Sequence, residues 1–255
     1  MEISGKTIVV TGAGGGIGRA LAQRFAHDGA ARVICADLDL DAAQHVAEGI
    51  GGVAMHCDVA QEAQIRALIE HTEAEIGPID LFCSNAGVLE TGGVECPDHV
   101  WSRSWDINVM SAVWAARHVV PRMIQRGGGY LLNTASAAGL LNMPGAAPYA
   151  VTKHAAVGLA EWLALTYGDQ GIGVTVLCPQ AVKSAMTQDN PGSVAEINGL
   201  LDPEDVAVIC ASAVTQNRFL ALPHPEVADY LRAKSEDYDR WIMGMQRLNA
   251  RFGGS

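Results

Sequence analysis

The chain lacks the patterns that mark zinc, redox or secreted proteins. Its six cysteines are scattered over 255 residues, and no two of them form a C-x-x-C pair. Zinc ribbons and thioredoxin-type sites are therefore excluded. The histidines show no metal-ligand spacing, so no metal is expected. Several cysteines stand in apolar runs and no secretory signal pattern follows Met1, which together predict a cytoplasmic protein with free thiols.

Long hydrophobic runs and clusters of positive charge are missing as well. No apolar stretch approaches the roughly 20 residues that cross a bilayer. The formal net charge is -11, and Lys and Arg form no cluster. Binding to nucleic acid or to an anionic membrane depends on clustered positive charge, so neither is expected as a partner. A small molecule is the expected ligand.

No Pro/Gly/Ser-rich linker, internal repeat or low-complexity segment divides the chain. Short apolar or β-branched runs alternate with helical patterns, as in sheets whose two faces are both covered. This predicts one α/β domain over residues 1–255, a Rossmann-type, doubly wound parallel sheet of about seven strands. The expected strands are Thr7–Thr11, Arg32–Ala36, Val53–Cys57, Leu81–Ser84, Gly129–Thr134, Val174–Cys178 and Arg218–Leu222. The expected helices include Ile17–Asp28, Leu40–Gly49, Gln61–Ile76, Trp101–Gln125 and Tyr149–Tyr167.

Two further segments differ from this alternation. Residues 187–200 are small and polar and contain Pro191 and Gly192, so we expect a mobile loop there that lines the substrate pocket. Residues 223–250 carry apolar side chains at steps of three, four or seven and are expected to form a C-terminal helical extension. Packing on its own domain and covering a pocket, in the same or a neighbouring subunit, are both open for this extension.

A glycine-rich turn joins the first expected strand to the first expected helix, in Thr11-Gly12-Ala13-Gly14-Gly15-Gly16-Ile17-Gly18. Glycine permits positive φ and close approach of a ligand to the backbone. The helix that begins near Ile17 would aim free N–H groups at a pyrophosphate. A glycine-rich turn without a ligand is the alternative interpretation.

Asp37 stands at the end of the second expected strand, 19 residues after Gly18. In dinucleotide-binding folds an acidic side chain at this point hydrogen-bonds the adenosine ribose, and it would repel the 2′-phosphate of NADP. The neighbouring Gly15 and Leu38 supply no cation for such a phosphate. The prediction is NAD rather than NADP, the alternative for Asp37 being a helix cap or a turn carboxylate.

Tyr149 and Lys153 lie one helical turn apart, so their side chains share a helix face. Taken alone, this spacing is usual for surface or core packing. Ser136 is equally interpretable as a strand-end turn residue, and Asn108 as a polar residue within a helix. The combination of all four with the glycine-rich turn is what favours a catalytic set.

These motifs resemble those of the classical short-chain dehydrogenases/reductases over about residues 3–186. Thr11, Gly12, Gly16 and Gly18 match the family's T-G-x-x-x-G-x-G pattern, and Asn85-Ala86-Gly87 matches its N-A-G motif. The resemblance places the catalytic residues at Asn108, Ser136, Tyr149 and Lys153. The residues expected to bind NAD are Gly12, Gly14, Gly16, Ile17, Gly18, Asp37, Asp58, Val59, Asn85, Ala86, Gly87, Tyr149, Lys153, Pro179 and Val182. The residues expected to bind substrate are Ser136, Met143, Tyr149 and Met186.

The chain departs from the family pattern in three places. Gln180 replaces the glycine that usually follows Pro179. Ser184 replaces a threonine that, by the family resemblance, contacts the carboxamide of the cofactor. The usual Asp-Gly-Gly ending is missing. The resemblance implies a homo-oligomer, and the altered ending leaves dimer and tetramer open.

The resemblance implies interconversion of a secondary alcohol and a ketone, with Tyr149 as general base and acid. We expect the Lys153 ammonium, together with the positive nicotinamide ring, to lower the Tyr149 pKa. Lys153 is also expected to hold the ribose, and Ser136 to stabilise the substrate oxygen. Asn108 is expected to organise a water chain to Lys153. Apolar pocket residues, with Leu140 and Leu141 among them, favour an uncharged hydrophobic substrate, whether alicyclic, aromatic, terpenoid or steroid.

Two other functions are considered. Epimerases and dehydratases of related fold carry a T-G-x-x-G-x-x-G pattern and have a longer chain with a separate substrate domain. The glycine spacing and the length of this chain therefore argue against those two functions. A non-catalytic NAD-binding regulatory protein has no need for Tyr149.

Overall fold

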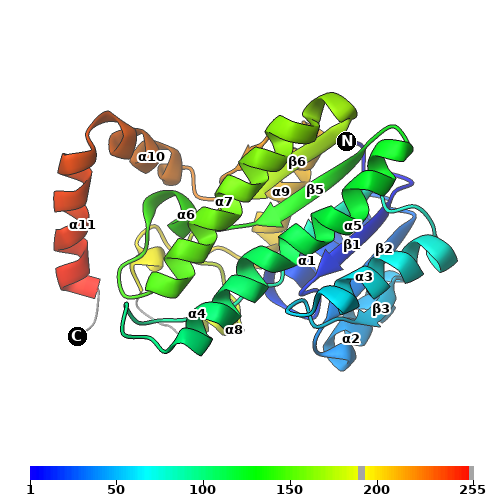
Figure 1. Ribbon diagram of the computed structural model, residues 1–255, viewed down its shortest axis with the longest axis horizontal. Coiled ribbons are helices and arrows are strands. Elements are labelled where there is room, and N and C mark those ends of the chain that lie inside the picture. The colour runs from blue at the N-terminus through cyan, green and yellow to red at the C-terminus, as the bar shows by residue number, and fades with distance from the viewer. Residues whose placement is uncertain (189–192, 253–255) are drawn as a thin grey trace.

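A seven-stranded, fully parallel sheet forms the centre of the computed structural model, in the order β3-β2-β1-β4-β5-β6-β7 (Figure 1). The structure describes residues 1–188 and 193–252. The strands are β1 Thr7–Thr11, β2 Arg32–Asp37, β3 Val53–His56, β4 Leu81–Ser84, β5 Gly129–Thr134, β6 Ile172–Leu177 and β7 Leu220–Ala221. The predicted fold class and all seven predicted strands are confirmed, with ends shifted by at most two residues.

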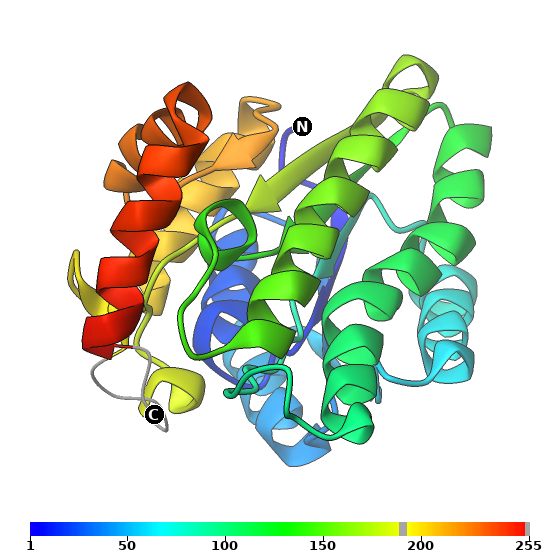
Figure 2. The same cartoon turned by 60° about the vertical axis from the view of Figure 1, so that its left-hand side comes forward.

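Helices cover both faces of the sheet (Figures 1 and 2). The α-helices are α1 Gly16–His27, α2 Leu40–Ile50, α3 Glu62–His71, α4 Asp98–Trp105, α5 Ser111–Gln125, α6 Ala138–Leu141, α7 Ala147–Tyr167, α8 Ala185–Gln188, α9 Pro203–Thr215, α10 Glu226–Glu236 and α11 Tyr238–Phe252. One buried apolar layer joins the sheet to α1, α2 and α9, and a second joins it to α3, α5 and α7. The continuous apolar strands follow from this double coverage.

The strand order reverses between β1 and β4, because β1 pairs with β2 on one side and with β4 on the other. At such a switch point the loops after two neighbouring parallel strands diverge and leave a crevice at their carboxyl ends. The loops after β1, β4, β5 and β6 all leave the sheet at this edge. The fold therefore predicts the ligand site here.

The helix expected over Trp101–Gln125 is continuous but contains a π-helical turn at Asp106–Met110, between α4 and α5. Ser111 donates a hydrogen bond to the Ile107 carbonyl at 2.6 Å. A π turn rotates the residues that follow it relative to a regular α-helix, and such turns are frequent at functional sites. Here the turn contains Asn108.

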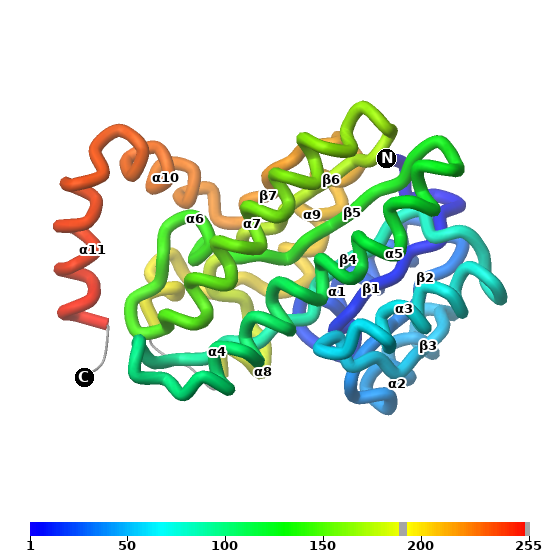
Figure 3. The backbone as a smooth tube through the Cα atoms, in the orientation of Figure 1, coloured from blue at the N-terminus to red at the C-terminus, as the bar shows by residue number. Residues whose placement is uncertain are grey.

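The expected extension over 223–250 forms two helices, α10 and α11, separated at Asp237 (Figure 3). Val227 in α10 is buried and packs with Ala137 and Leu141, together with the partly buried Tyr230 and Leu231. Helix α11 contains no buried residue and lies at the outer end of the molecule. Of the expected mobile loop 187–200, residues 189–192 lie outside the described residues, and Val194–Glu196 forms a 3-10 turn.

All six cysteines are free, and Cys96 alone is not fully buried. Burial raises the pKa of Cys35 to about 11 and the pKa of Cys57, Cys178 and Cys210 to about 12. Since the thiolate is the reactive form, these four thiols are inert at neutral pH.

We expect Phe25→Ala to lower the free energy of unfolding by about 3–5 kcal/mol, because removal of a large buried side chain leaves a cavity. Phe25 is fully buried between α1 and the sheet. Leu165→Ala on α7 is the control, since Leu165 is 85% exposed and its truncation should cost under about 0.5 kcal/mol. Urea unfolding measures both values, and equal losses would contradict the assigned core.

Candidate active site

A cavity of about 430 Å³ opens at the carboxyl edge of the sheet, between the loops after β1, β4, β5 and β6. Its lining contains every residue predicted to bind cofactor or substrate except Gly14, and three of the four predicted catalytic residues, Ser136, Tyr149 and Lys153. Asn108 lies outside the lining. Segments separated by more than a hundred residues in the sequence thus meet at one cavity.

The glycine-rich turn is a tight cradle at the start of α1. Gly12 and Gly16 have φ values of +66° and +50°, a region that favours glycine. A Cβ at Gly18 would collide with the Gly12 carbonyl oxygen, so only glycine allows α1 to begin so close to β1. The α1 N-terminus has no side-chain cap and no acidic residue in its first turn. Its N–H groups are therefore available to an anion.

Side chains from β1 and from the loop after β4 fix this cradle to the centre of the sheet. The Thr11 hydroxyl accepts hydrogen bonds from the Asn85 and Ala86 N–H groups at 3.0 and 3.2 Å. The Asn85 amide donates to the Thr11 carbonyl at 3.0 Å and accepts from the Thr134 hydroxyl at 3.0 Å. The switch point between β1, β4 and β5 is thereby held by short polar contacts.

Asp37 lines the cavity at the end of β2, where it was predicted. One carboxylate oxygen accepts the Gly14 N–H at 2.8 Å, and the other accepts the Asp39 N–H at 3.0 Å. Gly14, which was predicted to bind the cofactor, is not in the cavity lining and is joined to it through Asp37, so its predicted role stays a prediction. A Cβ there would lie 2.8 Å from the Ala42 side chain, so this glycine allows α2 to approach the cradle.

Ser136, Tyr149 and Lys153 come together where β5 and α7 meet the cavity. The Ser136 hydroxyl hydrogen-bonds the Tyr149 side chain, and it accepts the Ala138 N–H at 3.1 Å. The Lys153 ammonium donates to the Thr134 carbonyl at 3.0 Å and lies 5.6 Å from the centre of the Tyr149 ring. All three side chains are buried and face one shared volume.

Burial governs the titration of this set. It raises the pKa of the Tyr149 phenol, and the hydrogen bond with Ser136 opposes the rise. Burial also lowers the pKa of Lys153 to about 8. Without the cofactor, Lys153 alone does not lower the Tyr149 pKa, and the predicted lowering by Lys153 together with the nicotinamide ring stays a prediction. Burial is the largest cause of both shifts, since it disfavours the phenolate of Tyr149 and the ammonium of Lys153 alike.

Asn108 stands one layer behind the cavity, in the π-helical turn. Its side-chain amide donates to the Val88 carbonyl and to the Thr152 hydroxyl, both at 3.0 Å, and its oxygen accepts the Val88 N–H at 2.9 Å. A Cβ at Gly87 would lie 3.1 Å from the Asn108 oxygen and 3.3 Å from the Lys153 nitrogen. Asn108, Gly87 and Lys153 therefore adjoin one another.

The substrate end of the cavity is mostly apolar. Met143 and Met186 line it as predicted, with Val88, Leu89 and Ile107. Leu140 and Leu141 do not, because they pack against α10 and its neighbours.

One cation was missed by the sequence reasoning. Arg103, on α4, lines the cavity and is paired with Glu90. No spacing in the sequence connects these two residues. Because the charge of Arg103 is neutralised by Glu90, the cavity still presents no free cation at this end among the described residues.

A model of the short chain dehydrogenase family matches residues 6–193 of the chain. The chain belongs to this family. It is 40% identical over 192 residues to a 2,5-dichloro-2,5-cyclohexadiene-1,4-diol dehydrogenase of Sphingobium indicum, which covers 73% of the chain and 76% of that protein. It is 31% identical over 223 residues to a cyclohexanol dehydrogenase of an Acinetobacter strain, covering 82% and 88%.

A solved short-chain dehydrogenase/reductase from Burkholderia phymatum, in complex with NAD, superposes on this chain with a TM-score of 0.84. The two are 29% identical, and the match covers 94% of this chain and 96% of the other. The predicted family and fold are confirmed. The predicted NAD cofactor is supported by the NAD that is bound in this solved relative.

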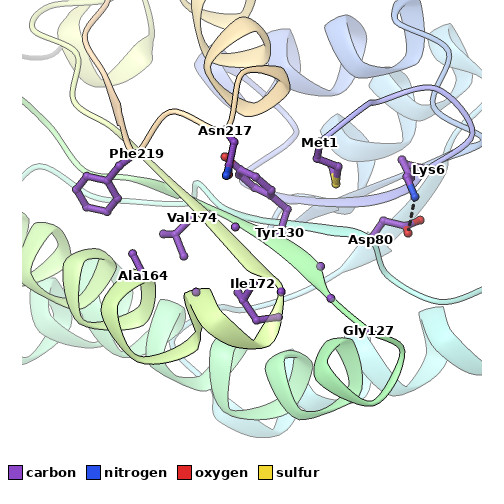
Figure 4. Close-up of a pocket in the computed structure, with 15 residues that line it drawn as sticks. Met1, Lys6, Asp80, Gly127, Tyr130, Ala164, Ile172, Val174, Asn217 and Phe219 are labelled. Carbon is purple, nitrogen blue, oxygen red and sulfur yellow. Dashed lines mark hydrogen bonds and ion pairs between the residues drawn. The ribbon is translucent and has the colours of Figure 1, made fainter.

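A second, larger cavity of about 650 Å³ lies at the opposite edge of the sheet (Figure 4). It is lined by the amino-terminal ends of β5 and β6 and by Asn217 and Phe219. The cations at its rim, the N-terminus and Lys6, bond the Val214 carbonyl and Asp80. Ligands of open parallel sheets bind at the carboxyl edge, so size alone does not make this cavity the functional site.

No helix within residues 1–188 and 193–252 is long and apolar enough to cross a membrane. The predicted homo-oligomer and cytoplasmic location stay predictions.

The lowered Lys153 pKa predicts a pH-dependent stability. Between pH 8 and about 10, folded Lys153 releases its proton while the unfolded lysine retains it, so the unfolded state binds more protons. The free energy of unfolding should therefore rise by up to ~1.4 kcal/mol per pH unit relative to Lys153→Met. Urea unfolding from pH 7 to 10 checks this, and parallel curves for both proteins would contradict it.

Proposed function

We propose that this protein is an NAD(H)-dependent oxidoreductase that interconverts a secondary alcohol and a ketone. The observation that carries the proposal is the meeting of Ser136, Tyr149 and Lys153 in the cavity that the glycine cradle borders. Proton transfer and binding of a dinucleotide are thereby available within one volume. Family membership alone would not support a reaction, since function depends on the site.

The cradle fits a dinucleotide. A side chain at Gly18 would fill it, and the N–H groups at the start of α1 are aimed where a pyrophosphate needs donors. Asp37 and Asp58 line the adenosine end, and Val59, Ala86, Pro179 and Val182 complete the walls. When bound, NAD supplies the hydride acceptor. The residues of this chain then handle only the proton.

Tyr149 takes the proton of the alcohol oxygen during oxidation and returns it during reduction. Burial keeps the phenol protonated at neutral pH in the cofactor-free site. A positive charge brought next to the phenol would favour the phenolate, and Lys153 holds such a charge below pH 8. Lys153 also holds the ribose hydroxyls, in line with its place in the lining.

Ser136 orients the alcohol oxygen and stabilises the developing alkoxide. Its hydroxyl hydrogen-bonds Tyr149, so both groups address one substrate oxygen. Asn108 keeps its predicted role of organising water toward Lys153, supported by the common neighbour Gly87. The water itself is part of the proposal.

The substrate is an uncharged secondary alcohol, and an alicyclic ring fits best. Met143, Met186, Leu89 and Ile107 provide apolar walls, and Arg103 is neutralised by Glu90. A carboxylate or phosphate would need an unpaired cation here. The relatives named for cyclohexanol and for a cyclic diol support a ring.

We expect Tyr149→Phe to lower kcat for NADH formation from cyclohexanol by at least about a thousand-fold, because it removes the proton-accepting oxygen and keeps the ring. The dissociation constant of NADH should change by less than about three-fold. Tyr238→Phe, on exposed α11, is the matched control. Substantial residual turnover in Tyr149→Phe would refute the assignment, and binding of NADH without any wild-type turnover would favour a regulatory protein.

Asp37 predicts discrimination between the two nicotinamide dinucleotides. NADH should bind at least ten-fold more tightly than NADPH, because the 2′-phosphate would face a carboxylate with both oxygens already fixed by backbone N–H groups. Asp37→Ser should reduce the ratio mainly by improving NADPH binding. Fluorescence titration gives both constants, and tighter NADPH binding by the wild-type protein would sink the cofactor assignment.

A further inference from the structure

Gln180 is a polar side chain in the cavity lining that the proposed chemistry does not use. It occupies the loop after β6, next to Pro179. The Pro179 carbonyl accepts the Ala137 N–H at 2.8 Å and lies 3.4 Å from the Ser136 hydroxyl. Gln180 is therefore linked through its neighbour Pro179 to Ser136, the residue proposed to orient the alcohol oxygen.

Residues of the C-terminal extension hold the backbone of Gln180 directly and its side chain through Asn198. Its N–H donates to the Nδ1 of His224 at 3.2 Å, and the His224 ring is buried. Its side-chain oxygen accepts the Asn198 amide at 2.8 Å, and the Asn198 oxygen accepts the Tyr230 hydroxyl at 3.2 Å. Helix α10 is thus connected to the cavity wall through a chain of three side chains.

These hydrogen bonds determine which end of the Gln180 side-chain amide remains available to a ligand. In the structure the Tyr230 hydroxyl donates to the Asn198 oxygen, and the Asn198 nitrogen donates to Gln180. Gln180 must then present its oxygen to Asn198, which leaves its own Nε2 with two N–H donors. Among the described residues Nε2 has no hydrogen-bond partner and is not an enclosed atom. Gln180 therefore offers donors, not acceptors, to the cavity.

We propose that Gln180 recognises a second, uncharged oxygen of the substrate, adjacent to the carbinol that is oxidised. The substrate class is then a vicinal diol, or an α-hydroxy ketone in the reverse direction. This inference rests on the proposed function. The oxidised carbinol loses its hydride to NAD and its hydroxyl proton to Tyr149, and the second oxygen keeps its bonds and accepts a hydrogen bond from Gln180.

The pairing of the nearby cations favours an uncharged oxygen at this position of the substrate. Arg103 is paired with Glu90, and Lys183, three residues beyond Gln180, is paired with Asp202 at 2.8 Å. A neutral amide is a sufficient donor for a hydroxyl or carbonyl oxygen, whereas a carboxylate calls for a guanidinium or an ammonium. Sites built to hydrogen-bond a substrate oxygen reject analogues that lack it more strongly than apolar pockets reject a missing methylene.

The test compares cis-1,2-cyclohexanediol with cyclohexanol, which share the ring and differ in the second oxygen. The quantity measured is the ratio of kcat/KM for the diol to kcat/KM for the monoalcohol, with NAD saturating. The wild-type ratio should exceed about ten, and Gln180→Leu should lower it by at least about ten-fold. Gln216→Leu, on the exposed end of α9, is the matched control and should leave the ratio as it is.

Tyr230→Phe examines the positioning chain. It removes one hydroxyl and keeps the ring, so Asn198 becomes free to turn and the Gln180 amide loses its fixed orientation. The ratio should fall several-fold, mainly through KM for the diol. Circular dichroism and NADH affinity, measured for every variant, show that fold and cofactor site are intact.

Each outcome bears on the inference. A wild-type ratio near one, or equal losses on both alcohols in Gln180→Leu, would overturn the role of Gln180 while the proposed function stands. If the wild-type protein oxidises neither alcohol nor any other secondary alcohol yet binds NADH, the proposed function fails and the inference falls with it.

Discussion

The site is organised around a buried ammonium. Lys153 is 3% exposed, and removing its charge from water is costly unless nearby oxygens compensate. The Thr134 carbonyl provides one such oxygen, Asn108 and Gly87 close one side, and the Tyr149 ring covers another. A Cβ at Gly139 would collide with the Lys153 carbonyl, so even the approach of α6 to α7 is adjusted to this residue. This one side chain is accommodated only if four segments are placed correctly relative to one another. They are the loop after β4, strand β5, the π-helical turn and helix α7.

Patterns that depend on local backbone geometry could be predicted from the sequence. The apolar runs identified all seven strands, because both faces of a parallel sheet are covered, and Gly12 and Gly18 stand where any side chain would clash. The spacing of Tyr149 and Lys153 placed both side chains on one helix face, and the cavity contains them. The strands and the helix face follow from local periodicity alone, whereas the clash at Gly12 is with Ala86 from the loop after β4.

What the sequence could not predict depends on three-dimensional packing. The direction of the Tyr149 pKa shift follows from how deeply the phenol is buried, which outweighs its hydrogen bond with Ser136. The packing of Leu140 and Leu141 against α10, and the hydrogen bond from Gly14 to Asp37, depend on contacts between separate elements. The pairing of Arg103 with Glu90 joins residues from a loop and a helix, and no periodicity reports it.

The burial of the thiols has a consequence for labelling. Five of the six cysteines are buried, and Cys96 alone, in the loop between β4 and α4, is within reach of solvent. The chain as it stands therefore carries a single attachment point for a maleimide or an iodoacetamide dye. A fluorophore placed there reports on the movements of that loop without any engineered cysteine, and the other sulfurs remain silent as long as the protein is folded.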